Sequence, residues 1–144
     1  VDKDTIEQRL LELKATFAPH TEPDVLKIAQ HTLSLLVIGM GRYHRGEKVS
    51  ASFFIKSYAL EQLTALIQAT TSPQNPHLVD DLNPSRRIEL THPQWSTQLH
   101  AIITAPVPDA AQIILDSVIQ LADTIPNFPA PAIDMVKGII WYKP

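Results

Sequence analysis

Cysteine is missing from the sequence, and glycine is scarce, with 4 residues against 12 prolines in a chain of 144. Without cysteine there can be no disulfide, no thiolate catalysis and no zinc site of the cysteine type, and the redox compartment stays open. There is no glycine-rich phosphate loop, no Gly-x-Ser-x-Gly motif and no His-Glu-x-x-His motif. The 6 histidines include no pair spaced four residues apart, so we expect no metal site.

Neither a strong charge excess nor a long apolar run is present. The formal net charge is −3, so no overall basic field favours binding to nucleic acid. The most apolar stretch, residues 33–40, is far shorter than the roughly 20 residues that cross a bilayer. The first residues, VDKDTIEQRL, are too charged for a signal peptide. We therefore expect a cytoplasmic protein without a membrane segment, folded as one compact domain.

Apolar residues recur at helical spacing along most of the chain, and prolines separate these stretches. No convincing alternating strand pattern is found. The predicted fold is an all-α bundle of five to six helices around a long antiparallel pair. We predict an extended linker at 126–131 and helices at 2–17, 22–44, 47–70, 94–104 and 109–125, with a last short helix or an extended tail at 133–142.

The two longest predicted helices meet at a short turn. Thr21 is expected to cap the first of them, with Asp24 three residues later. Basic residues fill its last turn and Gly46 follows, as is typical of a helix end, and so short a turn makes the two helices antiparallel neighbours. The first helix is apolar on nearly all sides near its middle, which fits either burial within one molecule or association into a homodimer.

The densest basic cluster of the chain lies at this turn. Its residues either form a solvated helix end, stabilised by the helix dipole, or line a binding site, and the sequence leaves both readings open. An arginine fork suits phosphate well. The candidate substrate- or nucleotide-binding residues here are Arg42, Tyr43, Arg45, Glu47 and, on the next helix, Lys56.

A second candidate region is the loop at 71–93, which is long for a structureless connection and for which we expect one short turn at 77–82. Its candidate binding residues are Arg86, Arg87 and Glu89, which could alternatively form an ion-pair network that holds the loop on the bundle. Arg87 and His92 also have the Arg-x4-His spacing of some helical ribonucleases. In those, the histidine activates the 2′-hydroxyl and the arginine binds phosphate. Prolines on both sides argue against a long helix through this motif.

The segments RYHRGEKVSASFFIKSYALEQLTALI and LNPSRRIELTHPQW resemble the C-terminal helical domain of bacterial nucleotidyltransferases of the aminoglycoside and lincosamide adenylyltransferase type. The resemblance covers roughly residues 5–125. It rests on the turn Arg45-Gly46-Glu47, on the paired Arg86 and Arg87 with Glu89, and on the helix start at 92–95. It implies a helical bundle that follows a small α/β catalytic domain. That domain binds Mg²⁺ and a nucleoside triphosphate, and the helical domain contributes to acceptor binding.

The chain departs from that family because the catalytic domain is missing. It has no Gly-Ser pair, and Asp80 and Asp81 are adjacent rather than alternating. We therefore expect no catalytic residue, metal or cofactor in residues 1–144. We take them as a single helical domain, the C-terminal part of a longer protein. The expected partners are an N-terminal or separate nucleotidyltransferase catalytic domain and a small-molecule acceptor.

Two alternatives describe a standalone helical module. One is a ribonuclease-like toxin, which requires Arg87 and His92 to share a solvent-exposed face. The other is a protein-interaction domain, which requires an exposed apolar patch, for which the tail at 139–142 is the first place to look.

Overall fold

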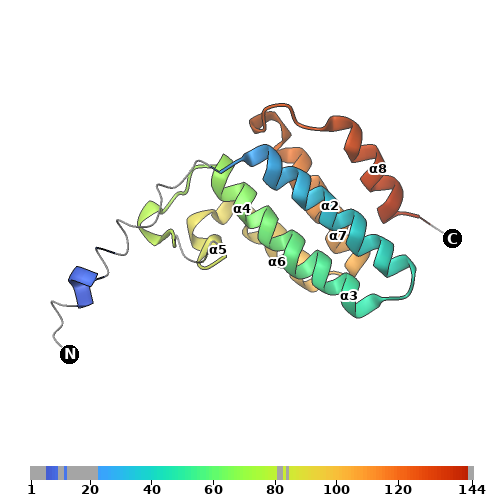
Figure 1. Cartoon of the computed structure of the whole chain (residues 1–144), viewed down its shortest axis with the longest axis horizontal. Coiled ribbons are helices and arrows are strands. Elements are labelled where there is room, and N and C mark those ends of the chain that lie inside the picture. The colour runs from blue at the N-terminus through green and yellow to red at the C-terminus, as the bar shows by residue number, and fades with distance from the viewer. Residues whose placement is uncertain (1–5, 10–11, 13–22, 81–82, 84, 143–144) are drawn as a thin grey trace.

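The computed structural model describes residues 6–9, 12, 23–80, 83 and 85–142. In this part of the chain every regular element is helical, and the predicted all-α bundle is confirmed (Figure 1). The elements are α2 (Val25–His44), α3 (Lys48–Phe53), the π-helix η1 (Phe54–Ala59), α4 (Leu60–Thr70), α5 (Ile88–Thr91), α6 (Ser96–Thr104), α7 (Val107–Gln120) and α8 (Ala130–Ile140), with short 3₁₀ turns η2 (Pro76–Leu78), η3 (Pro93–Trp95) and η4 (Ala122–Thr124).

The predicted helix 2–17 falls mostly outside the described residues. Of it, residues 6–9 and Glu12 are described, and they are helical and exposed. The predicted cap Thr21 also lies outside the described residues. The observed cap of α2 is Asp24, whose carboxylate accepts a hydrogen bond of 3.0 Å from the backbone N–H of Lys27. Such a cap contributes about 1 kcal/mol to helix stability.

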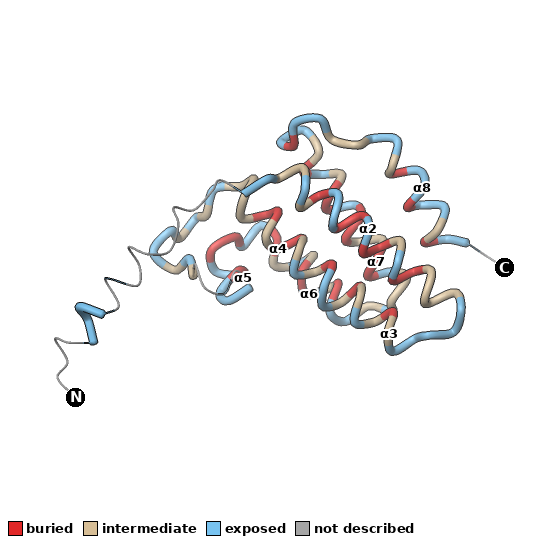
Figure 2. Tube along the Cα trace, in the orientation of Figure 1, coloured by how far each residue is buried: buried red, intermediate tan, exposed pale blue. Residues whose placement is uncertain are grey.

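The antiparallel pair of long helices forms the centre of the bundle, as predicted. Figure 2 shows that the buried residues lie along the faces that α2, α4 and α7 turn toward one another. On α2 these are Ala29, Leu33, Leu36 and Met40, none more than 4% exposed. Burying a side chain of this size contributes about 1.5–3 kcal/mol, so this stripe contributes substantially to the stability of the bundle.

The second long helix, from α3 through η1 to α4, buries residues at strict four-residue spacing. Ala51, Ile55, Ala59, Leu63 and Ile67 are all 0% exposed. In an α-helix each four-residue step overshoots a full turn by about 40°, so four steps would carry the last residue about 160° away from the first. The π-helical segment absorbs about one extra residue, or about 100°, and thereby keeps the set on one face.

The same π-helical segment explains where the sequence prediction was wrong. Phe53 and Tyr58 belong to the apolar residues of the sequence 47–70, but they are 57% and 49% exposed. Ile55, which the α-helical spacing did not select, is fully buried against α2. It lies next to Gly39, where an added Cβ would come within 2.6 Å of the Ile55 Cδ1 atom. The two helices therefore approach more closely here than any larger residue at position 39 would allow.

The C-terminal half covers this pair on two sides. Helices α6 and α7 pack with Trp95, Ile102 and Ile114 inward, each 3% exposed or less, whereas the neighbouring Ile103 is 55% exposed. Helix α8 runs alongside α2 in the same direction (Figure 1). It begins at Ala130, so the predicted linker 126–131 is shorter than expected, because a proline in the first helical turn is tolerated.

Candidate functional site

The turn between α2 and α3 closes through its backbone. The N–H of Gly46 donates to the Tyr43 carbonyl oxygen and that of Glu47 to the Arg42 carbonyl oxygen, both at 3.0 Å. This pair of backbone hydrogen bonds is the Schellman motif of a helix C-terminus. It requires a left-handed residue after the helix, and Gly46 has a φ of +88°. The predicted turn is therefore observed, and it places the basic cluster at one end of the bundle.

Arg42 holds the two long helices together at this end. Its guanidinium donates a hydrogen bond to the Ser50 hydroxyl, and its Cζ atom lies 4.5 Å from the centre of the Phe54 ring. Both partners are on the second helix, and Arg42 itself is half-buried. An arginine stacked on an aromatic face and bonded at its fork is well suited to such a structural contact.

The other residues of the cluster also make local contacts. The Lys48 ammonium donates to the Tyr43 carbonyl oxygen at 2.8 Å and lies 3.3 Å from the centre of the Tyr43 ring. Arg45 and Glu47 form an ion pair of 2.8 Å, with their side chains 63% and 43% exposed. A pair this exposed contributes about 0–1 kcal/mol. Of the two readings of the basic cluster, these contacts favour the stabilised helix end.

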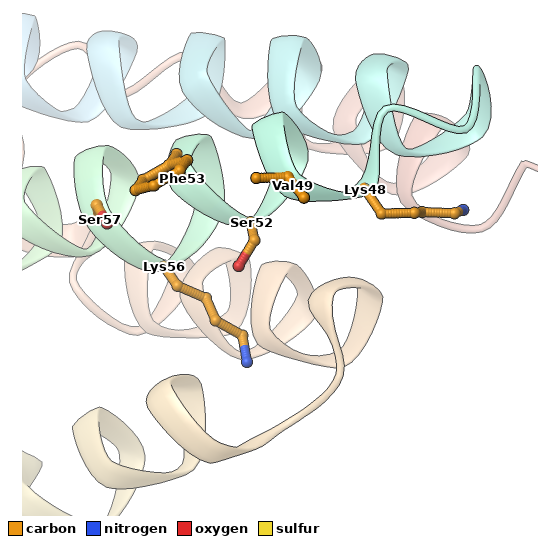
Figure 3. A pocket seen from close by; sticks show the side chains of 6 residues that line it. All are labelled: Lys48, Val49, Ser52, Phe53, Lys56 and Ser57. Atoms are coloured by element: carbon orange, nitrogen blue, oxygen red, sulfur yellow. The ribbon is translucent and has the colours of Figure 1, made fainter.

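A hollow of about 410 Å³ lies beside this turn, on the exposed side of α3 and η1. Figure 3 shows Val49 and Phe53 with Ser52, Ser57 and the two lysines Lys48 and Lys56 around it. Val49 is 74% exposed, which is high for a side chain of its type. The hollow is open to solvent and shaped by one helix, so it forms one wall of a site rather than an enclosed cavity.

Lys56 is the sequence-predicted candidate that reaches this hollow. Its ammonium points toward α6 (Figure 3) and donates to the Ile103 carbonyl oxygen at 3.0 Å. Because an ammonium has three N–H groups, this one bond leaves two for a ligand, whereas the Lys48 ammonium is held by both the Tyr43 carbonyl oxygen and the Tyr43 ring. The sequence prediction did not include Ser52, Phe53 and Ser57, which also line the hollow. The available signal was the spacing of Val49, Phe53 and Lys56 on one helical face.

The second group of candidates lies at the opposite end of the bundle. Helix α4 ends roughly 33 Å from Lys48 at about 1.5 Å per residue, and α5 lies near that end (Figure 1). Arg86 donates to the Asp80 carboxylate at 3.0 Å. Within the part of the chain that the structure describes, neither Arg87 nor Glu89 forms an ion pair. Of the loop network given as an alternative, the described residues show the pair Arg86–Asp80, and the two candidate groups lie at opposite ends of the bundle.

The pair proposed for a ribonuclease does not share a surface. His92 is 1% exposed, and its ring nitrogens contact the Thr91 hydroxyl at 3.0 Å and the Thr71 carbonyl oxygen at 3.3 Å. Arg87 is exposed and has a left-handed φ of 63° just before α5. The nuclease alternative required a solvent-exposed histidine, so this geometry does not provide its catalytic base.

Among the described residues, no group of three or more histidine, aspartate and glutamate side chains is placed to hold a metal ion. None of the described helices combines the length and the apolar character that crossing a membrane requires.

Comparison with known proteins gives no match to a family model, to a curated protein or to a solved structure.

Proposed function

We propose that this chain is the helical substrate-binding domain of a nucleotidyltransferase-like protein, not catalytic by itself, and that the hollow lined by Lys48, Val49, Ser52, Phe53, Lys56 and Ser57 is its contact with the nucleotide. The turn Arg45-Gly46-Glu47 joins two long antiparallel helices, and a proline and an aromatic residue start the helical turn before α6, in keeping with the sequence resemblance. These features support the assignment of the domain.

The observation that carries the ligand assignment is the chemistry of the hollow. Phe53, 57% exposed, offers a face on which a base can stack, and Lys56, with Lys48 farther along the hollow, offers ammonium donors to phosphate oxygens (Figure 3). The volume of about 410 Å³ falls within the usual range of small-molecule sites. A polycationic acceptor is disfavoured at this place, because both charged residues that line it are positive.

The openness of the hollow fits a site that a second domain completes. Ligand sites are frequent at domain interfaces, where each domain contributes one wall. In this proposal the catalytic domain supplies the acidic residues that bind Mg²⁺ and the reacting phosphates, and this chain supplies the stacking face and two cations. Exposed Val49 then lies where that second domain makes contact.

Nucleotide binding to the chain is tested by titration with ATP, followed through the backbone amide NMR signals. We expect shifts confined to residues 48–57 at millimolar ATP, weaker shifts with adenosine, and weaker binding as salt rises. Phe53→Ala and Lys56→Gln should each reduce the affinity severalfold. Leu90→Ala and Lys27→Gln are matched controls, since both residues are exposed and lie outside the hollow. Shifts elsewhere, or equal binding by all four variants, would overturn the ligand assignment.

A further inference from the structure

Helix α8 lies at the edge of the bundle and carries an exposed apolar stripe (Figure 2). Its members are spaced four, three and four residues apart, so they fall on one side of the helix: Pro131, Met135, Gly138 and, just beyond the helix end, Tyr142. Met135 is 59% exposed and Tyr142 is 56% exposed. On α2 the apolar surface continues with Ile38, which is 44% exposed and lines a hollow of about 570 Å³ together with Gly138 and Tyr142. An exposed apolar surface of this kind marks an interaction site.

The stripe is complementary to itself, because its spacings are the same in both directions. When a second copy of the helix lies antiparallel on the first, Met135 of each copy falls opposite Gly138 of the other, and Tyr142 falls opposite Pro131. Each large side chain therefore meets a smaller one. Gly138 leaves room for this contact, since nothing lies within 4 Å of an added Cβ atom. Large residues facing small ones allow two surfaces to interdigitate, so the stripe fits a second copy of itself.

Two opposite charges lie beside this stripe. Asp134 and Lys137 are both exposed on α8, and within the described residues neither forms an ion pair. In the antiparallel arrangement Asp134 of one copy lies about 3 Å along the axis from Lys137 of the other, which is within reach of the lysine side chain. The two-fold symmetry makes this pair twice. Exposed ion pairs contribute little affinity, but they select the partner and its orientation.

We propose that this chain forms a homodimer in which the two α8 helices pack antiparallel across a two-fold axis. Met135 of each copy then enters the hollow that Ile38 and Gly138 of the other copy line. A two-fold interface requires a self-complementary surface, and the symmetric spacing and the two opposite charges of α8 provide one.

The size of this contact predicts a weak dimer. The 11 residues of α8 span about 16 Å, so the interface is small and its dissociation constant should be about 100 µM. The inference does not depend on the proposed nucleotide site, because the hollow of that site shares no residue with the stripe or with the hollow beside it.

Sedimentation equilibrium of the chain between about 10 µM and about 1 mM tests for the dimer. We expect the mass to rise from one chain toward two over this range. Met135→Asp should raise the dissociation constant by about tenfold or more. Ile103→Asp, at a similarly exposed apolar residue on α6, should leave it unchanged. A chain that stays monomeric, or a dimer that responds equally to both substitutions, would overturn the proposal.

Exchanged charges test the antiparallel arrangement. Asp134→Lys alone and Lys137→Asp alone each place like charges across the two-fold axis, so each variant should dimerise severalfold more weakly than the parent chain. An equal mixture of the two variants should recover the parent affinity, because every lysine at these positions then faces an aspartate of the other chain. A defect in folding would not be cured by mixing. A mixture that associates no better than its two components would contradict the antiparallel contact.

Discussion

The close approach of α2 and η1 makes a sharp prediction about Gly39 and Ile55. Gly39→Ala adds a methyl group 2.6 Å from Ile55 Cδ1, 2.9 Å from Ile55 Cγ1 and 3.0 Å from Phe54 Cβ. Alanine in a helix gains up to about 1 kcal/mol over glycine, but overpacking of a full core costs about 1–3 kcal/mol. We therefore expect Gly39→Ala to lower the free energy of unfolding by about 0–2 kcal/mol.

Ile55→Val should relieve the tightest part of this clash, the contact with Cδ1, while the contacts with Cγ1 and with Phe54 Cβ remain. Valine lacks the Cδ1 atom, and at this fully buried site the change alone should cost about 0.5–1.5 kcal/mol. In the double variant the new methyl group occupies the space that the lost one leaves. The two changes should then be less destabilising together than their sum by about 1 kcal/mol or more.

Urea unfolding of the parent chain, both single variants and the double variant measures this coupling. Gly138→Ala is the control, because nothing lies within 4 Å of its added Cβ, and it should stabilise α8 by about 0.5–1 kcal/mol. Additivity within about 0.5 kcal/mol would refute the close contact between Gly39 and Ile55, since independent sites add to that accuracy.

Three further substitutions test the local structure by urea unfolding. Asp24→Ala removes the cap of α2 and should cost about 1 kcal/mol, with no loss if the cap is not formed in solution. Gly46→Ala places a side chain at a φ of +88° and should cost about 1–2 kcal/mol, whereas an unchanged stability would contradict the left-handed turn. His92→Ala leaves a cavity and an unpaired Thr71 carbonyl oxygen and should cost about 2–4 kcal/mol; a cost below about 0.5 kcal/mol would instead fit a surface histidine.

The long helix pair could be predicted from the sequence because its signals are local. Basic residues followed by Gly46 end one helix, and apolar spacing marks both. The π-helix could not be found in that way. Selecting large apolar residues at α-helical spacing predicts that Phe53 and Tyr58 are buried and overlooks Ala51 and Ala59. The four-residue repeat of Ala51, Ile55, Ala59, Leu63 and Ile67 is present in the sequence, but only the structure shows that these residues are the buried ones.

The candidate site was harder to predict, because charged residues at a turn look alike whether they bind a ligand or hold the fold. Arg42 was a candidate for phosphate, but its contacts with Ser50 and Phe54 depend on how two helices meet. Helix α5 was missed because its four residues are too few to show a period. Lys56, a binding candidate from the sequence, lines the hollow, whereas Phe53, which lines it too, was not a candidate.

The first experiment is to purify the gene product from its own source and to assay it for nucleotide transfer. We expect the native protein, or the complex that it forms, to transfer the nucleotidyl group of ATP with Mg²⁺ to a small acceptor. Phe53→Ala in this chain should lower kcat/KM by about tenfold, a loss of about 1.4 kcal/mol, and Leu90→Ala should not. An absence of transfer to any acceptor tried, or equal rates for the two variants, would contradict the assignment of this chain as a substrate-binding domain.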